Sequence, residues 1–287
     1  MRRASRGARI GEYMTVTNAV ETTMIWGTVS GASMVGMAVS LLLSVGLPIF
    51  LCIFIYKKTK AWVPAFFIGC GIFVGFAMIL EQICHAIVLT VTGSAIRDNI
   101  WLYAIYGGLA AALFEECGRW IAMKFCLKKH LTRENALMYG AGHGGIEAFL
   151  ILGMSSMSNL LTAAMINGGL MEKTMTALEP AQQEVTYHQL SVLWTTPAYQ
   201  FYLAPVERIS AIALQIALSI LVYSAVKTGR KLQLAAAFGL HFAVDFLTVI
   251  CASMIPTWAL ELGLLVVVAV ICAAVYKLVY VHSAEKK

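Results

Sequence analysis

Residues 41–56, LLLSVGLPIFLCIFIY, decide the fold class, because they form an uncharged apolar run of the kind that crosses a bilayer. A similar run, LGLLVVVAVICAAVY, covers residues 262–276. The chain of 287 residues is 60% hydrophobic and 13% charged, whereas soluble domains carry about 25% charged residues. The sequence therefore predicts an all-α, multi-pass protein of the cell membrane, with the lipid bilayer as its first partner.

Seven hydrophobic segments follow one another along the chain. Each is predicted to be a transmembrane helix, because a chain in lipid must satisfy its own backbone hydrogen bonds. Their approximate ranges are 31–56, 61–88, 100–126, 134–158, 198–226, 232–254 and 258–281. Residues 31–287 are expected to form a single transmembrane helical domain, preceded by an extension of residues 1–30.

Basic residues between the segments indicate how the bundle lies in the membrane, since Lys and Arg gather in cytoplasmic loops. One side receives Lys57, Lys58, Lys60, Lys128, Lys129, Arg133, Lys227, Arg230, Lys231, Lys286 and Lys287. This side is predicted to be cytoplasmic, so the N-terminus lies outside and the C-terminus inside. The net charge of +6 comes from these dispersed clusters, which does not favour nucleic-acid binding.

The extreme N-terminus departs from the charge rule, because four arginines there would lie outside. They are Arg2, Arg3, Arg6 and Arg9. Our hypothesis is that translation starts at Met14, which would remove all four. Arg9 in the N-terminal peptide of the native protein would contradict it.

The longest connection, residues 168–197, is predicted on the outer side. It begins with polar residues such as Glu172 and Glu179 and ends with an apolar group that includes Leu193 and Trp194. Connections of this length are either functional or disordered. The two interpretations are a lid that dips into the interface and an ordinary solvated loop.

Ionisable residues lie deep inside three of the apolar segments, where a charge costs at least ~2.5 kcal/mol and marks a functional site. The three sets are Glu115, Glu116 and Arg119; His143 and Glu147; and His241 and Asp245. Counting the helical rise of ~1.5 Å per residue from the nearest basic loop places Glu116 at a depth of ~18 Å. The two histidines come at ~15 Å, and Glu147 and Asp245 at ~21 Å. All lie near the middle of a ~30 Å hydrocarbon core, which predicts one buried polar site.

Spacing within each segment supports this convergence. His143 and Glu147 are four residues apart, as are His241 and Asp245, so each pair projects from one helical face. Arg119 can reach both glutamates of its own helix. Two adjacent carboxylates cannot both stay ionised cheaply in a low dielectric, so either one is protonated or Arg119 holds it charged.

Other features of these segments carry weaker signals. Glycines surround His143, and Gly140 and Gly144 form a GxxxG pattern that lets helices approach closely. Two further polar pairs, Glu81 with His85 and Glu207 with Arg208, are expected to be structural bridges or interfacial groups, and either could line an access path.

Three motifs carry a family resemblance: EECGR at residues 115–119, HGGIEA at 143–148 and HFAVD at 241–245. They resemble the YhfC family of intramembrane proteases and, more remotely, the type II CAAX prenyl proteases and the PrsW proteases. The resemblance runs from the third to the sixth segment. The chain departs from the CAAX pattern in two ways. Two residues rather than three separate the glutamate pair from Arg119, and Glu147 follows His143. These departures argue against a prenylated substrate.

The resemblance implies a role for each residue. Glu115 or Glu116 would be the general base with His143 as its partner, and the i+4 spacing to Arg119 favours Glu115. Arg119 would orient the glutamate pair. His241 and Asp245 would stabilise the tetrahedral intermediate. Glu147 completes the candidate catalytic set.

A divalent metal such as zinc is a second interpretation of the same residues. Two histidines and one carboxylate, with water in the fourth position, form a catalytic zinc site. His143 and His241 would supply the imidazoles, and Glu116, Glu147 or Asp245 the carboxylate; our candidate set is His143, Glu147 and His241. The chain has no HExxH helix, so residue type alone carries this interpretation.

These observations predict an intramembrane peptidase that hydrolyses a membrane-associated protein or peptide with Glu/His-activated water. One alternative is a proton- or ion-coupled transporter, because intramembrane acids and bases also form relays. The absence of an internal repeat in the sequence argues against it. The other alternative is a non-catalytic scaffold in which polar residues join helices.

Overall fold

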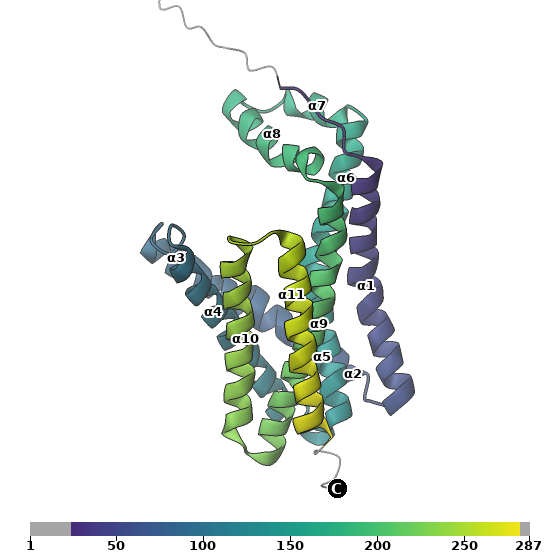
Figure 1. Ribbon diagram of the computed structural model, residues 1–287, viewed down its shortest axis with the longest axis vertical. Coiled ribbons are helices and arrows are strands. Elements are labelled where there is room, and N and C mark those ends of the chain that lie inside the picture. The colour runs from purple at the N-terminus through teal and green to yellow at the C-terminus, as the bar shows by residue number, and fades with distance from the viewer. Residues whose placement is uncertain (1–23, 282–287) are drawn as a thin grey trace, which may run out of the picture.

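The computed structural model describes residues 24–281, and every regular element within this range is a helix (Figure 1). The N-terminal arginines and the Met14 hypothesis lie outside the described residues. Seven helical spans in the described range are long and apolar enough to cross a membrane, which confirms the predicted class and number. They are Gly31–Thr59, Pro64–Thr92, Ile100–Cys126, Arg133–Asn167, Ala198–Thr228, Lys231–Ala252 and Thr257–Tyr280.

Several spans contain more than one helical element. The first, fifth and sixth spans are the single helices α1, α9 and α10. The others are built from α2 (Pro64–Phe73) and α3 (Gln82–Thr92), α4 (Ile100–Ile121), α5 (Arg133–Ala148) and α6 (Met154–Asn167), and α11 (Thr257–Val275). Short π-helical segments continue or join them at Val74–Glu81, Ala122–Cys126, Phe149–Gly153 and Tyr276–Tyr280. The fourth span, predicted to end near residue 158, continues to Asn167 and is longer than a bilayer requires.

The basic loops gather at one end of the bundle, which we call the basic end. Figure 1 shows the turn from α9 to α10 and the end of α11 at its bottom. The turn from α10 to α11 lies at the opposite, far end, and α6 to α8 extend beyond it (Figure 1). The basic end is defined by Lys57, Lys58, Lys60, Lys128, Lys129, Lys227, Arg230 and Lys231. Its cytoplasmic position stays a prediction.

The long outer connection is helical, which differs from the loop that we expected. It contains α7 (Leu170–Met175) and α8 (Pro180–Thr195). The apolar end of α8 packs against the start of the described chain, where the rings of Trp194 and Trp26 lie 5.9 Å apart. Leu193 belongs to the same cluster, together with buried residues of α1 and α6. These apolar residues find a packing surface at the far end of the bundle, which is the physical reason for an ordered helix here.

Helix α9 lies at the centre of the bundle. In an apolar stretch of 18 residues of this helix, 72% is buried inside the structure, compared with 11% to 33% in the other spans. Glycines let α2, α5 and α9 approach closely. A Cβ atom added at Gly69 of α2 would lie 2.2 Å from the carbonyl oxygen of Tyr139 and 2.8 Å from the backbone nitrogen of His143. One added at Gly140 of α5 would lie 2.7 Å from the Cα of Ile216 on α9. These contacts hold His143 in the middle of the bundle.

Gly69 and Gly71 offer a matched pair of substitutions on one helix. Gly69→Ala should destabilise the protein by ~1–3 kcal/mol, because the added methyl group meets backbone atoms that cannot move independently. Gly71→Ala meets nothing within 4 Å and should be neutral or slightly stabilising, since alanine favours helix. The stability of each variant is measured as the temperature at which the purified protein loses its monodisperse peak in detergent. Equal thermal stability of the two variants would contradict the close α2–α5 contact.

Candidate active site

Arg119 of α4 is the buried centre of the site, with no exposed surface. Its Nε lies 3.2 Å from Glu116 Oε2, and its Nη2 lies 3.9 Å from Glu115 Oε2. The guanidinium group also donates to α9: Nη1 to the backbone oxygen of Gln215 at 2.6 Å and to Ser219 Oγ at 2.8 Å. Nη2 donates to Gln215 Oε1. The arginine therefore joins α4 to α9 and pairs with both glutamates.

His143 of α5 lies directly beside Glu115. Its Nε2 is 2.9 Å from Glu115 Oε2, the geometry of an N–H that donates to a carboxylate. Arg119 Nη2 lies 3.4 Å from the same nitrogen. The ring of Phe73 packs edge-on against the imidazole at a centroid distance of 5.2 Å. The imidazole of His143 is completely buried, so hydrogen bonding and packing both fix its orientation.

His241 of α10 binds the second glutamate and also faces the first. Its Nδ1 lies 2.8 Å from Glu116 Oε1, and its Nε2 lies 3.9 Å from Glu115 Oε2. Asp245, one turn further along α10, has Oδ2 3.5 Å from the same Nε2. The imidazole is thus set among three carboxylates from two helices.

Glu147 joins these residues through Gln215 of α9. The amide nitrogen of Gln215 donates to Glu115 Oε2 at 2.9 Å and to Glu147 Oε2 at 2.8 Å. The other carboxylate oxygen of Glu147 accepts from Arg208 Nη1 at 3.0 Å. All seven candidate residues therefore belong to one network, as the matched depths predicted.

Three members of this network were missed by sequence reasoning. Gln215 and Ser219 are polar, four residues apart and inside an apolar span, which is the same signal that marked the histidine pairs. Arg208 was predicted to bridge with Glu207, and it does, but it also reaches Glu147. The other predicted bridge, His85 Nε2 to Glu81 Oε1, is present at 3.2 Å.

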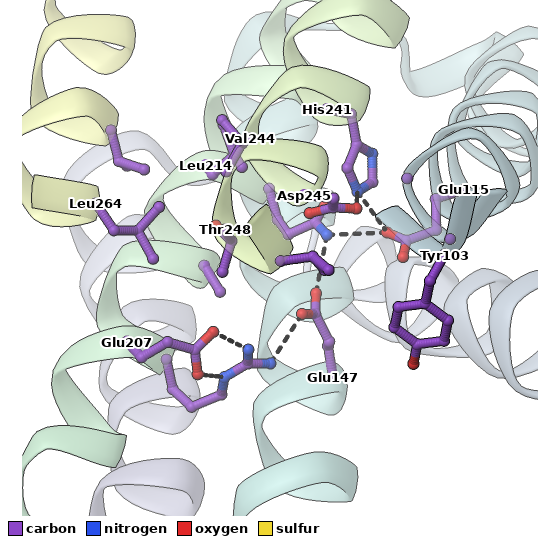
Figure 2. Close-up of a pocket in the computed structure, with 17 residues that line it drawn as sticks. Tyr103, Glu115, Glu147, Glu207, Leu214, His241, Val244, Asp245, Thr248 and Leu264 are labelled. Atoms are coloured by element: carbon purple, nitrogen blue, oxygen red, sulfur yellow. Dashed lines mark hydrogen bonds and ion pairs between the residues drawn. The ribbon is translucent and has the colours of Figure 1, made fainter. Parts of the chain in front are cut away.

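A cavity of about 320 Å³ opens beside the network, between α4, α9, α10 and α11. Figure 2 shows Glu115, Glu147, His241 and Asp245 directed toward one another around it. Glu116, Arg119 and His143 lie behind this wall, with at most 1% of their surface exposed. The network thus has a front that lines the cavity and a back that is fully buried.

The donor types at the front and back of the site fit a divalent metal. The Nε2 atoms of His143 and His241 both face one oxygen of Glu115, at 2.9 and 3.9 Å. Two imidazoles and a carboxylate are zinc ligands. Within residues 24–281, however, no group of three or more such side chains is already spaced to hold an ion. The side chains bond to one another instead, and Glu147 is engaged by Arg208 and Gln215.

Comparison with known proteins supports the family resemblance. The family model described as YhfC intramembrane metalloprotease matches residues 43–272. The uncharacterized membrane protein YhfC of Bacillus subtilis (strain 168) is 42% identical over 222 residues, which cover 74% of this chain and 83% of that protein. No solved structure matches the chain. The chain therefore belongs to the YhfC family, whose family model carries the description of an intramembrane metalloprotease.

Proposed function

We propose that the protein is an intramembrane peptidase that hydrolyses a peptide bond of a membrane-associated protein or peptide. The observation that carries this proposal is the position of Glu115, which lines the cavity and accepts hydrogen bonds from His143 and Gln215 through the same oxygen, Oε2. A carboxylate fixed at a cavity wall can take a proton from a water molecule that enters the cavity.

Glu115 is the proposed base rather than Glu116. Glu116 is fully buried behind the cavity wall, with Oε1 2.8 Å from His241 Nδ1 and Oε2 in an ion pair with Arg119, and it does not line the cavity. Glu115 keeps one oxygen, Oε1, that accepts no hydrogen bond from a side chain in the network described above, and a water could approach it. Glu116 therefore acts as a positioning residue for His241 and Arg119.

The remaining residues provide for the other steps of hydrolysis. The water oxygen attacks the carbonyl carbon while its proton passes to Glu115. The proton then moves from Glu115 to the amide nitrogen as the C–N bond breaks. In its protonated form, His241 donates through Nδ1 to Glu116 and presents Nε2–H at the cavity, where a donor would stabilise the developing oxyanion. Asp245 orients that imidazole, and Arg119, His143 and Gln215 hold Glu115.

The walls of the cavity suit an apolar substrate segment. Leu214, Val244, Leu264 and Val268 line it beside the polar front. Binding pockets of this kind combine apolar walls with a few placed polar groups. An unwound stretch of a membrane-associated chain matches both parts, because its side chains are apolar and its peptide groups polar.

A divalent metal such as zinc is a further proposal, supported by the family description and by the approach of both histidines to Glu115. His143, His241 and a carboxylate would hold it, and Glu147 is the carboxylate chosen from the sequence. When bound, zinc would supply a Lewis acid that polarises the carbonyl group or activates water.

Substitution of Glu115 tests the peptidase directly. Glu115→Gln should reduce cleavage by ~10²–10⁴-fold, the usual contribution of a general base. The measurement is comparative proteomics of membrane-protein fragments from cells that express the wild type or the variant. Glu134→Gln, a glutamate outside the network that pairs with Arg133 at the basic end, is the matched control and should leave the fragments unchanged. Identical fragments from wild type and Glu115→Gln would count against proteolysis.

Metal analysis of the purified protein tests the zinc proposal. We expect about one zinc per chain, as in other catalytic zinc sites, and loss of this zinc in His143→Ala and in His241→Ala. The matched control is His188→Ala, which changes a histidine of α8 outside the network. This variant should retain the zinc. A wild-type protein without bound divalent metal, or one whose metal survives both histidine substitutions, would contradict the proposed ligands.

A further inference from the structure

The cavity lies on one side of the polar network, toward the far end of the bundle. Its lining on α10 runs from His241 to Val249, or ~15–27 Å from Lys231 at ~1.5 Å per residue. Its lining on α9 runs from Gln215 to Glu207, away from the basic end. The cavity thus leads from the middle of the membrane toward the far end.

The polar side chains that line the cavity are more exposed than Glu116 behind it. The side chain of Glu116 is 2% exposed and that of Glu115 is 9% exposed. The values are 36% for Asp245, at mid-membrane depth, and 26% for Glu207 and 14% for Arg208, both nearer the far end. Tyr103, in the first turn of α4, is 46% exposed. We call this cavity the vestibule; it extends from the buried Glu115 to the exposed Tyr103 at the far end.

The path toward the basic end is filled by apolar side chains. Met123 follows Arg119 in the third span, Leu127 comes directly after that span, and Met138 precedes His143. Leu218 and Val222 occupy the same level on α9, and all five are completely buried in one core cluster. Close-packed side chains of this kind leave no room for water or a peptide. The site is therefore closed toward the basic loops.

We propose that substrate and water reach the site through this vestibule, so that the cleaved bond lies in the half of the membrane away from the basic end. This inference rests on the proposed function. The substrate is then a membrane-associated chain with an apolar segment that unwinds into the vestibule from the far side. By the positive-inside rule, that side is the outer one.

Thiol labelling measures this access without a substrate. Val244→Cys places a thiol in the vestibule wall at mid-membrane depth. Leu247→Cys is the matched control, because Leu247 lies closer to the far end of α10 but is 52% exposed on the outside of the bundle, where lipid surrounds it. A membrane-impermeant maleimide is added to spheroplasts or to inside-out vesicles, and the labelled peptide is identified by mass spectrometry. This readout leaves the native cysteines in place.

Two exposed positions report which side of the membrane the maleimide reaches. Ser94→Cys marks the far end, and Lys227→Cys marks the basic end. We expect Val244→Cys to react only from the Ser94 face and Leu247→Cys to react from neither, because a thiol in lipid does not ionise. Ala211→Cys, across the vestibule on α9, should behave like Val244→Cys and serves if that variant does not fold.

Reaction of the vestibule cysteines from the Lys227 face, or from neither face, would overturn the proposal. Equal reaction of Leu247→Cys would do so as well, since it would show that depth alone decides labelling. The result is independent of proteolysis, because no peptide bond is cleaved in the measurement. A failed peptidase assay with far-side labelling would reject the proposed function and keep the access path from the far side.

Discussion

The buried guanidinium group of Arg119 is the constraint on which the rest of the structure depends. A charge with no exposed surface in the middle of a membrane is stable only if its donors are satisfied and its charge is balanced. Glu115 and Glu116 supply the charge, and Gln215 and Ser219 on α9 supply the acceptors. Because these partners come from α4 and from the central helix, the arginine fixes the relative position of two spans, and the histidines of α5 and α10 then meet the glutamates.

This arrangement separates the two glutamates, although they are neighbours in the chain. Glu116 faces Arg119 and His241 behind the cavity wall, and Glu115 reaches the cavity with His143 and Gln215 on one oxygen. A helix turns by about 100° per residue, so adjacent residues can serve a buried and an open environment at once. In the mechanism that we propose, Glu116 therefore positions its neighbours and Glu115 takes part in proton transfer.

Sequence reasoning predicted the seven spans and the convergence of their charged residues, because both follow from strong physical costs. A long apolar run has few alternatives to a membrane helix, and buried charges must meet partners. It did not predict the helix α8, since apolar residues such as Leu193 and Trp194 in a polar connection do not reveal their packing surface. Gln215 was also missed, because its amide carries no charge. An uncharged group inside an apolar span is a weaker sign of a functional site than an ionisable one. The i+4 spacing to Arg119 already favoured Glu115 over Glu116, and our proposal of Glu115 as the base adds the side-chain directions, which a sequence does not give.

The central claim is that water, activated at Glu115, cleaves a peptide bond inside this site. The most direct measurement incubates the purified protein in liposomes with a library of transmembrane peptides in water enriched in heavy oxygen. Mass spectrometry then reads the new carboxyl termini. We predict fragments whose new carboxyl group carries one heavy oxygen atom, formed by the wild type and not by a preparation that lacks the Glu115 carboxylate. Absence of labelled fragments, or their equal formation by both preparations, would contradict the claim.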